Sequence, residues 1–370
     1  MRKKLVLSSL FICAFVLVLS LINHKEIKEN KPTSIKVPEP TQEKKVPSPT
    51  PQVFFKQPGA SALLMIPVYV HQTFNNCGPA TLSMMLSYYG TNVSQKEVGE
   101  AMRPYQQPKG NNDDKTIFPE EMVSYAKKYG YFGLSRPNGT IYLLKKFTTN
   151  GIPVIVRTWL HTYDDIGHFR IVTGFDDKNK VIIQDDSYEA QGKKIPYEEF
   201  NKLWQPFNYG YIVIYQKSKQ GAVEEILGPD YEEKTAWQAA QKRALTELNL
   251  NNGSIYSGFN LSVSLYYLGE YRQAIEEFEK IENQLPRRML WYQLEPILAY
   301  QKLGSYDRVL SLTEKILNDN NRAFSELYQI RGEVYFAVGD KIKAKEEFEK
   351  AIFYNKNFLP AQRSIQELGN

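Results

Sequence analysis

Residues 71–90 read HQTFNNCGPATLSMMLSYYG, and this stretch decides the fold expected for the first half of the chain. Four apolar residues recur at the spacing of one helix face: Leu82, Met85, Leu86 and Tyr89. Gly90 is a natural helix end, and Pro79 is tolerated only in the first turn of a helix. The pattern therefore predicts a helix with Cys77 at its N-terminal end.

Cys77 is a candidate nucleophile because of this position. Unpaired backbone N–H groups and the helix dipole stabilise an anion there, which favours the reactive thiolate. The only other cysteine, Cys13, lies in an apolar N-terminal segment, so we expect no disulfide. Gln72 is a candidate to donate its side-chain amide to an oxyanion, together with the backbone N–H of Cys77. The alternative is a buried structural thiol with Gln72 on the surface.

His168 is the candidate base for this thiol. It opens an expected strand, GHFRIVTGF at 167–175, which a turn at 176–180 joins to a second expected strand at 181–184. The start of one hairpin strand lies beside the end of its neighbour, so Asp185 can meet His168 and fix its orientation. The alternative is a satisfied structural histidine on a strand.

The other histidines fit this role less well. His24 lies in a polar linker, and His71 stands directly beside Gln72. His161 precedes a loop and has no partner that the sequence reveals. His161 stays as the alternative base.

The motifs at Gln72, Cys77-Gly78-Pro79-Ala80, Gly167-His168 and the strand end at Asp185 resemble the bacteriocin-processing type of papain-like cysteine peptidases, family 39 of the cysteine peptidases. The resemblance covers about residues 60–216 and implies a papain-like α+β fold. It implies that Cys77 attacks, His168 acts as base, Asp185 orients the base and Gln72 binds the oxyanion. The family often has Asp-Pro at this strand end, whereas Asp186 follows here, so Asp186 is a second candidate for the orienting role.

The resemblance supports the chemistry more than a particular substrate. Bacteriocin processors cut after a double glycine and are fused to transport domains, but this sequence shows no further membrane span and no nucleotide-binding motif. We therefore expect a peptide or protein substrate of unspecified sequence. No cluster of Cys and His has the spacing of metal ligands, so we expect no metal and no other cofactor.

The N-terminus predicts a membrane anchor. Three basic residues precede an apolar run from Leu5 to Ile22, as in a signal peptide or a single membrane helix. No small-x-small cleavage site follows, so we predict a signal-anchor over 1–24, with a cleaved signal and secretion as the alternative. Because a basic flank stays on the cytoplasmic side, we expect the rest of this chain, which we take to be bacterial, to lie outside the cell membrane. Residues 25–57 carry six prolines among polar residues and are predicted to form an extended linker.

The C-terminal part has an internal period. Gly269, Gly304 and Gly339 lie 35 residues apart, each at the end of an expected helix. Five residues after each glycine stand Ala274, Val309 and Ala344, where paired helices would cross closely. The pattern resembles tetratricopeptide repeats, with a degenerate middle unit that contains Pro296 and with flanking helices at 237–248 and 359–368. This resemblance implies that the repeats bind a protein partner. The alternative is that these helices only support the first domain.

Composition limits the remaining function classes. The 370 residues suggest two or three domains, and the net charge of +5 is spread along the chain, so we expect no nucleic-acid binding. We predict an α+β papain-like cysteine peptidase domain over 58–222 and an all-α tetratricopeptide-repeat domain over 223–370. The function expected is a membrane-tethered, extracytoplasmic cysteine peptidase whose repeats recruit a substrate or partner. The alternatives are a catalytically silent binding scaffold and a thiol enzyme that transfers its acyl group to an acceptor other than water.

Overall fold

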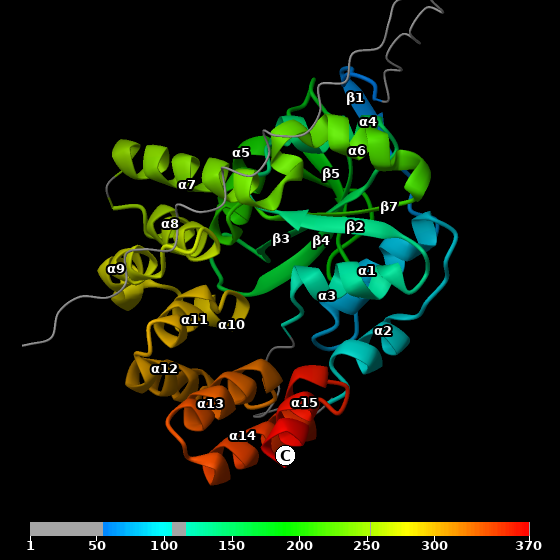
Figure 1. Cartoon of the computed structure of the whole chain (residues 1–370). Coiled ribbons are helices and arrows are strands. Elements are labelled where there is room, and N and C mark those ends of the chain that lie inside the picture. Colours follow the sequence, from blue (N-terminus) through cyan, green and yellow to red (C-terminus); the bar gives the residue numbers. More distant parts are fainter. Residues whose placement is uncertain (1–54, 106–115, 252, 370) are drawn as a thin grey trace, which may run out of the picture. The chain divides into compact units, whose positions relative to one another are not determined.

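The computed structural model describes residues 55–105, 116–251 and 253–369. The predicted membrane helix at 1–24 and nearly all of the predicted linker lie outside these residues. Within the described ranges, no helix combines the length and the apolar character needed to span a bilayer. The sheet and the helical repeats belong to one compact unit, Gln52–Asn370 (Figure 1).

The first half is built on one seven-stranded antiparallel sheet. Its strand order is β2-β7-β3-β4-β5-β6, and β1 pairs with β4. The strands are β1 (Ser61–Leu63), β2 (Phe132–Arg136), β3 (Val154–Trp159), β4 (Gly167–Asp176), β5 (Val181–Asp185), β6 (Lys193–Pro196) and β7 (Tyr211–Tyr215). The predicted hairpin of β4 and β5 is confirmed. The apolar stretch 63–70 contributes only Leu63 to a strand, and Pro67 within it lacks the N–H that a ladder requires.

Helices cover both faces of this sheet. One core lies between the sheet and the first three helices, and it contains Leu82, Met85 and Leu86. A second core lies on the other face beneath the next three helices and contains Val172 and Phe175. The helices are α1 (Cys77–Tyr88), α2 (Gln95–Met102), α3 (Pro119–Lys127), α4 (Ile141–Thr149), α5 (Tyr197–Trp204) and α6 (Gln220–Leu227). This α+β architecture is the predicted fold class.

The second half is all helical and has the predicted repeat pattern. Its helices are α7 (Glu233–Leu250), α8 (Ile255–Tyr267), α9 (Tyr271–Ile281), α10 (Met289–Tyr292), α11 (Glu295–Lys302), α12 (Tyr306–Asn318), α13 (Ser325–Ala337), α14 (Lys341–Tyr354) and α15 (Leu359–Leu368). The three repeat glycines all have positive φ and follow α8, α11 and α13. The degenerate middle unit differs because its first helix is broken into α10 and α11 ahead of Pro296.

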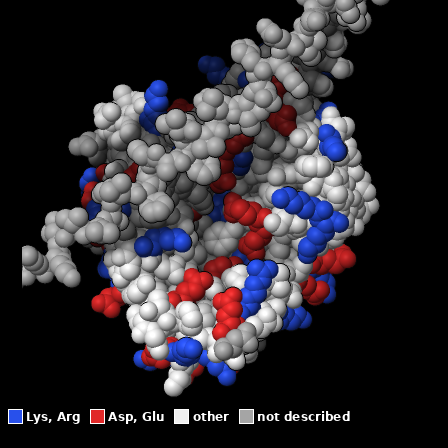
Figure 2. Space-filling view, viewed as in Figure 1, with Lys and Arg blue, Asp and Glu red and all other residues white. Residues whose placement is uncertain are grey.

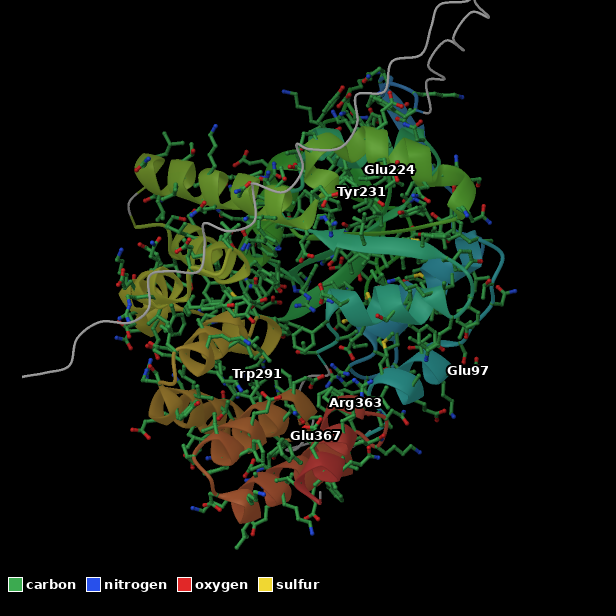
Figure 3. All side chains as sticks on the ribbon, in the orientation of Figure 1. Glu97, Glu224, Tyr231, Trp291, Arg363 and Glu367 are labelled. Carbon is green, nitrogen blue, oxygen red and sulfur yellow. The ribbon has the colours of Figure 1, made fainter. Side chains whose placement is uncertain are left out.

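The repeats pack closely on the sheet half. Trp291 of α10, labelled in Figure 3, is buried, and its carbonyl accepts a hydrogen bond from Thr116 Oγ1 at 2.8 Å. Arg103 pairs with Glu326 of α13 at 2.8 Å. The predicted boundary between 222 and 223 falls inside α6, and Val223 of that helix packs in the core of the sheet half. The helical half therefore begins with α7, the first helix that packs on the repeat helices rather than in the core of the sheet half.

Candidate active site

Cys77 is the first residue of α1, as the sequence predicts, and it is partly buried. One turn later, Thr81 Oγ1 donates a hydrogen bond to the carbonyl of Phe169 at 3.1 Å. Phe169 follows His168 in β4, so this bond holds the first turns of α1 against the strand that carries the candidate base.

His168 is paired with a buried carboxylate. Its Nε2 lies 2.7 Å from Asp186 Oδ1, and both residues are buried. The other oxygen of Asp186 accepts a hydrogen bond from Arg170 Nε at 2.7 Å. Asp186 Oδ1 also accepts from the backbone N–H of Tyr188 at 2.8 Å. This carboxylate is fixed at both oxygens, and it favours the His168 tautomer that has its proton on Nε2 and its lone pair on Nδ1.

The charges of this buried group balance one another. Burial lowers the pKa of His168, and the bond to Asp186 opposes that shift. Burial alone would raise the pKa of Asp186, but His168 and Arg170 outweigh it and hold that pKa well below its usual range. Burial also lowers the pKa of Arg170, which the negative charge of Asp186 opposes. His168 is therefore suited to accept a proton, while Asp186 stays ionised beside it.

Asp185, which the sequence predicts as the orienting carboxylate, does not contact His168. Its Oδ1 instead accepts the backbone N–H of Gly192 at 2.8 Å. A register shift between Val172 and Gly174 of β4 pairs Asp185 with Ile171, on the face of the sheet opposite His168. The prediction for Asp185 is thus corrected, and the second candidate, Asp186, takes the position beside the imidazole.

Gln72 is tied to the residues that follow Asp186. Its backbone N–H donates to the carbonyl of Ser187 at 2.8 Å, and Ser187 Oγ donates to Gln72 Oε1 at 2.8 Å. Tyr69 reinforces this link because its hydroxyl donates to the carbonyl of Asp186 at 2.8 Å. These bonds occupy the acceptor end of the Gln72 amide. The Nε2 end makes no hydrogen bond with the residues that the structure describes, and it can serve as a donor to an oxyanion.

His161 is not the isolated histidine that the sequence suggests. Its Nδ1 lies 2.8 Å from Asp164 Oδ2, and its Nε2 lies 3.1 Å from Glu189 Oε1. Tyr163 stacks on the ring with a centroid separation of 4.9 Å. Both nitrogens of His161 are therefore engaged by carboxylates, which leaves His168 as the better placed base.

Two important residues of this site escaped the sequence interpretation, Arg170 and Ser187. Arg170 stands two residues after His168 in a strand, and residues two apart share a face, so the strand alternation was an available signal. Ser187 had no such signal, because its partner Gln72 is 115 residues away. Among the described residues, no group of three or more His, Cys, Asp and Glu side chains is placed to hold a metal ion.

Comparison with known families supports this description of the first half. Residues 63–212 match the model of the Peptidase_C39 like family. This match confirms, for the first half of the chain, the resemblance inferred from the Cys77 and His168 motifs.

Several solved structures are similar to parts of the chain. A C39-like peptidase from Bacillus anthracis is 16% identical with a TM-score of 0.36, over 42% of this chain and 98% of that chain. The peptidase domain of Streptococcus ComA, a bifunctional ABC transporter involved in quorum sensing, is 24% identical with a TM-score of 0.31, over 40% and 97%. MamA is 18% identical with a TM-score of 0.33, over 40% and 82%. No curated protein sequence matches the chain.

Proposed function

We propose that this protein is a cysteine peptidase in which Cys77 is the nucleophile, His168 the base, Asp186 the orienting carboxylate and Gln72 an oxyanion donor. One observation carries the proposal. The His168–Asp186 pair, at 2.7 Å, lies at the start of β4, against which the helix that begins at Cys77 is hydrogen-bonded. A thiol at a helix N-terminus, and a carboxylate-oriented imidazole on the strand against which that helix packs, are the groups that thiol hydrolysis requires.

The proposed reaction has two steps. In the first, His168 Nδ1 takes the proton of Cys77, and the sulfur attacks the peptide carbonyl. The carbonyl oxygen becomes an oxyanion that the Cys77 backbone N–H and Gln72 Nε2 stabilise. The C–N bond then breaks as His168 returns the proton to the amine. In the second step, water adds to the thioester with His168 as base, which releases the acid and the free thiol.

We also propose where the enzyme lies in the cell and what its repeats bind. The basic flank and apolar run at 1–24 support an anchor in the cell membrane with both halves outside the cytoplasm. The helical region that resembles tetratricopeptide repeats supports recruitment of a peptide or protein partner. Protease added to intact cells or spheroplasts should digest a tag at Asn370 without lysis, whereas a cytoplasmic control protein survives. Protection of the tag until lysis would contradict the extracytoplasmic placement.

Thiol labelling and a hydrolysis assay test the chemistry. Iodoacetamide should alkylate Cys77 with a midpoint below the ~8.5 of a free cysteine. Gln72→Ala should lower turnover of a peptide library by roughly 10²–10³-fold, the usual loss for one oxyanion donor. Cys77→Ala serves as the inactive control. Labelling with an ordinary midpoint and no turnover would support the silent scaffold, whereas products joined to an added amine would support acyl transfer.

A further inference from the structure

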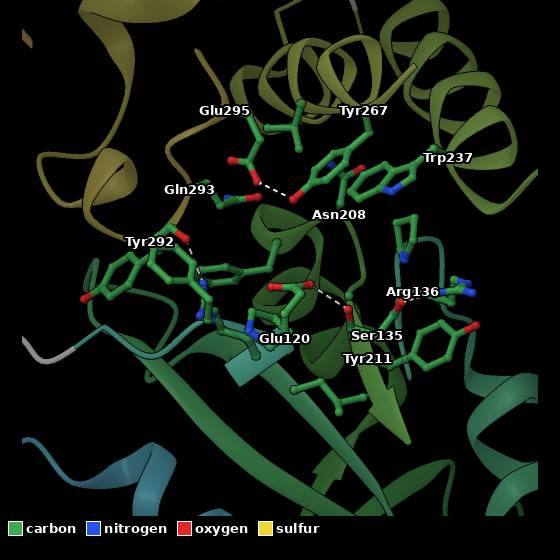
Figure 4. A pocket seen from close by; sticks show the side chains of 18 of the residues that line it. Glu120, Ser135, Arg136, Asn208, Tyr211, Trp237, Tyr267, Tyr292, Gln293 and Glu295 are labelled. Carbon is green, nitrogen blue, oxygen red and sulfur yellow. Dashed lines mark hydrogen bonds between the residues drawn. The ribbon is translucent and has the colours of Figure 1, made fainter. Parts of the chain in front are cut away.

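A cavity of roughly 100 Å³ lies between the sheet half and the helical repeats (Figure 4). Its sheet side includes Glu120 at the start of α3, Arg157 of β3 and Ser135 of β2. Its repeat side includes Trp237 of α7 and Glu295 of α11. Figure 2 shows acidic side chains gathered around a hollow near the centre of this face. A space of this size can hold several waters or the head of one side chain.

One wall of the cavity is aromatic. Trp237 and Tyr267 stack in parallel, with centroids 4.0 Å apart and an interplanar angle of 7°. Tyr267 is 40% exposed, so this wall is open to solvent. Such a surface attracts the methylene groups and the positive head of a Lys or Arg side chain.

Beside this aromatic wall lies a carboxylate that is only partly hydrogen-bonded. Glu295 Oε1 accepts a hydrogen bond from the Tyr267 hydroxyl at 3.0 Å, as the dashed line in Figure 4 shows. Glu295 Oε2 is buried and accepts no hydrogen bond from any other described residue. A buried acceptor without a partner is costly, so this oxygen is a natural place for a donor from a ligand.

The basic residues of the cavity wall leave this acceptor available. Arg157 donates its Nη1 to the Tyr292 carbonyl at 2.8 Å and its Nη2 to the Ile117 carbonyl. Arg136 donates to backbone carbonyls at positions 230 and 231. Glu120 is bonded to Ser135 Oγ at 2.8 Å, so its carboxylate also faces the cavity region. The hydrogen-bonding capacity that remains is mainly that of acceptors.

We propose that this cavity binds the basic side chain of a peptide, with Glu295 Oε2 accepting from its ammonium or guanidinium group and the Trp237–Tyr267 pair covering its methylene groups. Arg157 both lines the cavity and interacts electrostatically with Cys77, so the cavity lies near the candidate nucleophile. As a statement about the substrate, this inference rests on the proposed peptidase function, and it selects peptides that carry Lys or Arg.

The protonation of Glu295 gives the proposal a pH signature. Burial raises the pKa of Glu295 to about 7, and Glu120 adds to this shift, whereas the backbone N–H of Glu295, the Tyr267 hydroxyl and Arg157 oppose it. Tyr267 and Tyr266 of α8 are the other titratable groups that interact with this carboxyl. A cationic ligand needs the ionised form, so its affinity should rise about tenfold between about pH 6 and about pH 8.

Direct binding to the full chain carrying Cys77→Ala tests the inference without any catalysis. The probes are Nα-acetyl-arginine amide and its uncharged counterpart Nα-acetyl-citrulline amide, titrated calorimetrically. The arginine probe should bind about tenfold more tightly, which corresponds to one charge-assisted hydrogen bond. Glu295→Gln should remove that preference, whereas Glu224→Gln, an exposed control on α6, should keep it.

Two results would overturn the inference: equal affinities for the two probes, or a preference that Glu295→Gln leaves unchanged. If Glu295→Gln does not fold, Trp237→Leu tests the aromatic wall instead. An unreduced affinity of that variant for the arginine probe would contradict the proposal equally. Because these titrations use protein without the nucleophile, their failure is distinct from a failure of the proposed peptidase activity.

Discussion

Gly167 lies directly against the ring of Tyr292, with no room for a side chain between them. A Cβ atom at position 167 would stand 2.8 Å from a ring carbon of Tyr292. Gly167 immediately precedes His168 at the start of β4, and Tyr292 is the last residue of α10. The helical repeats therefore contact the strand that carries the candidate base.

Gly167→Ala should consequently affect both stability and activity. We expect a loss of about 1–3 kcal/mol in the free energy of unfolding, the usual cost of overpacking. Hydrolysis should fall as well, because the strain is relieved by moving the residue that precedes His168. Gly59→Ala is the matched control, since a Cβ atom there meets nothing within 4 Å. Equal denaturant midpoints for the two variants would show that Tyr292 adapts without cost.

Asp186→Asn and Asp185→Asn should differ sharply in activity. Asp186→Asn removes the carboxylate that fixes the His168 tautomer, so kcat/KM should fall by on the order of 10³–10⁴, as for other orienting aspartates. Asp185→Asn should keep most activity, because the carboxylate of Asp185 accepts a hydrogen bond from the backbone N–H of Gly192 rather than from His168. Circular dichroism of both variants would check folding. A larger loss in Asp185→Asn would return the orienting role to that residue.

The Asp185 correction shows what the sequence could and could not predict. The hairpin itself was predictable from two apolar strands around a polar turn. In a regular register Asp185 would face Val172, which shares its side of β4 with His168, but the bulge moves Asp185 to the other side and brings Asp186 into its place. Gly174 within the strand was the one hint of that bulge.

Features that depend on local sequence patterns were predicted correctly elsewhere, whereas contacts between distant parts of the sequence were not predicted. The helix start at Cys77 and the closing helix at 359–368 follow from short-range periodicity and were predicted correctly. The contact of α10 with Gly167 joins residues more than a hundred positions apart, and no periodic signal encodes it. The predicted boundary at 222–223 lies within α6 for a related reason, since the helical pattern of this segment does not reveal which core it joins.

Glu295 should make the stability of the protein depend on pH in a defined direction. Its pKa is raised by burial from 4.5 to about 7, so the folded chain holds a proton that the unfolded chain releases. The contribution of Glu295 to the free energy of unfolding is fully present below about pH 4.5 and is lost as the pH rises through about 7. The total loss is roughly 3 kcal/mol. Urea unfolding of wild type and Glu295→Gln should show the variant gaining relative stability across this window. A difference that is constant with pH would contradict the shift.

The last prediction concerns cooperativity between the two halves. The sequence predicts a separate domain over 223–370, but Trp159 of β3 and Phe207 pack in the same core as Phe259 and Tyr292 of the repeats. Trp159 is 3% exposed, and its ring lies 5.8 Å from that of Tyr292. Two halves that share buried aromatic contacts should unfold together rather than one after the other.

Trp159→Ala should therefore destabilise both halves at once. Removing this buried ring should cost about 3–5 kcal/mol, as for other large-to-small core changes. Hydrogen exchange should show lost protection in β3 and in α8 by similar amounts, and calorimetry should still show one transition at a lower temperature. Leu250→Ala, at a side chain that is 84% exposed, is the control and should change neither. Lost protection confined to β3, with α8 unchanged, would mean that the repeats unfold independently of the sheet.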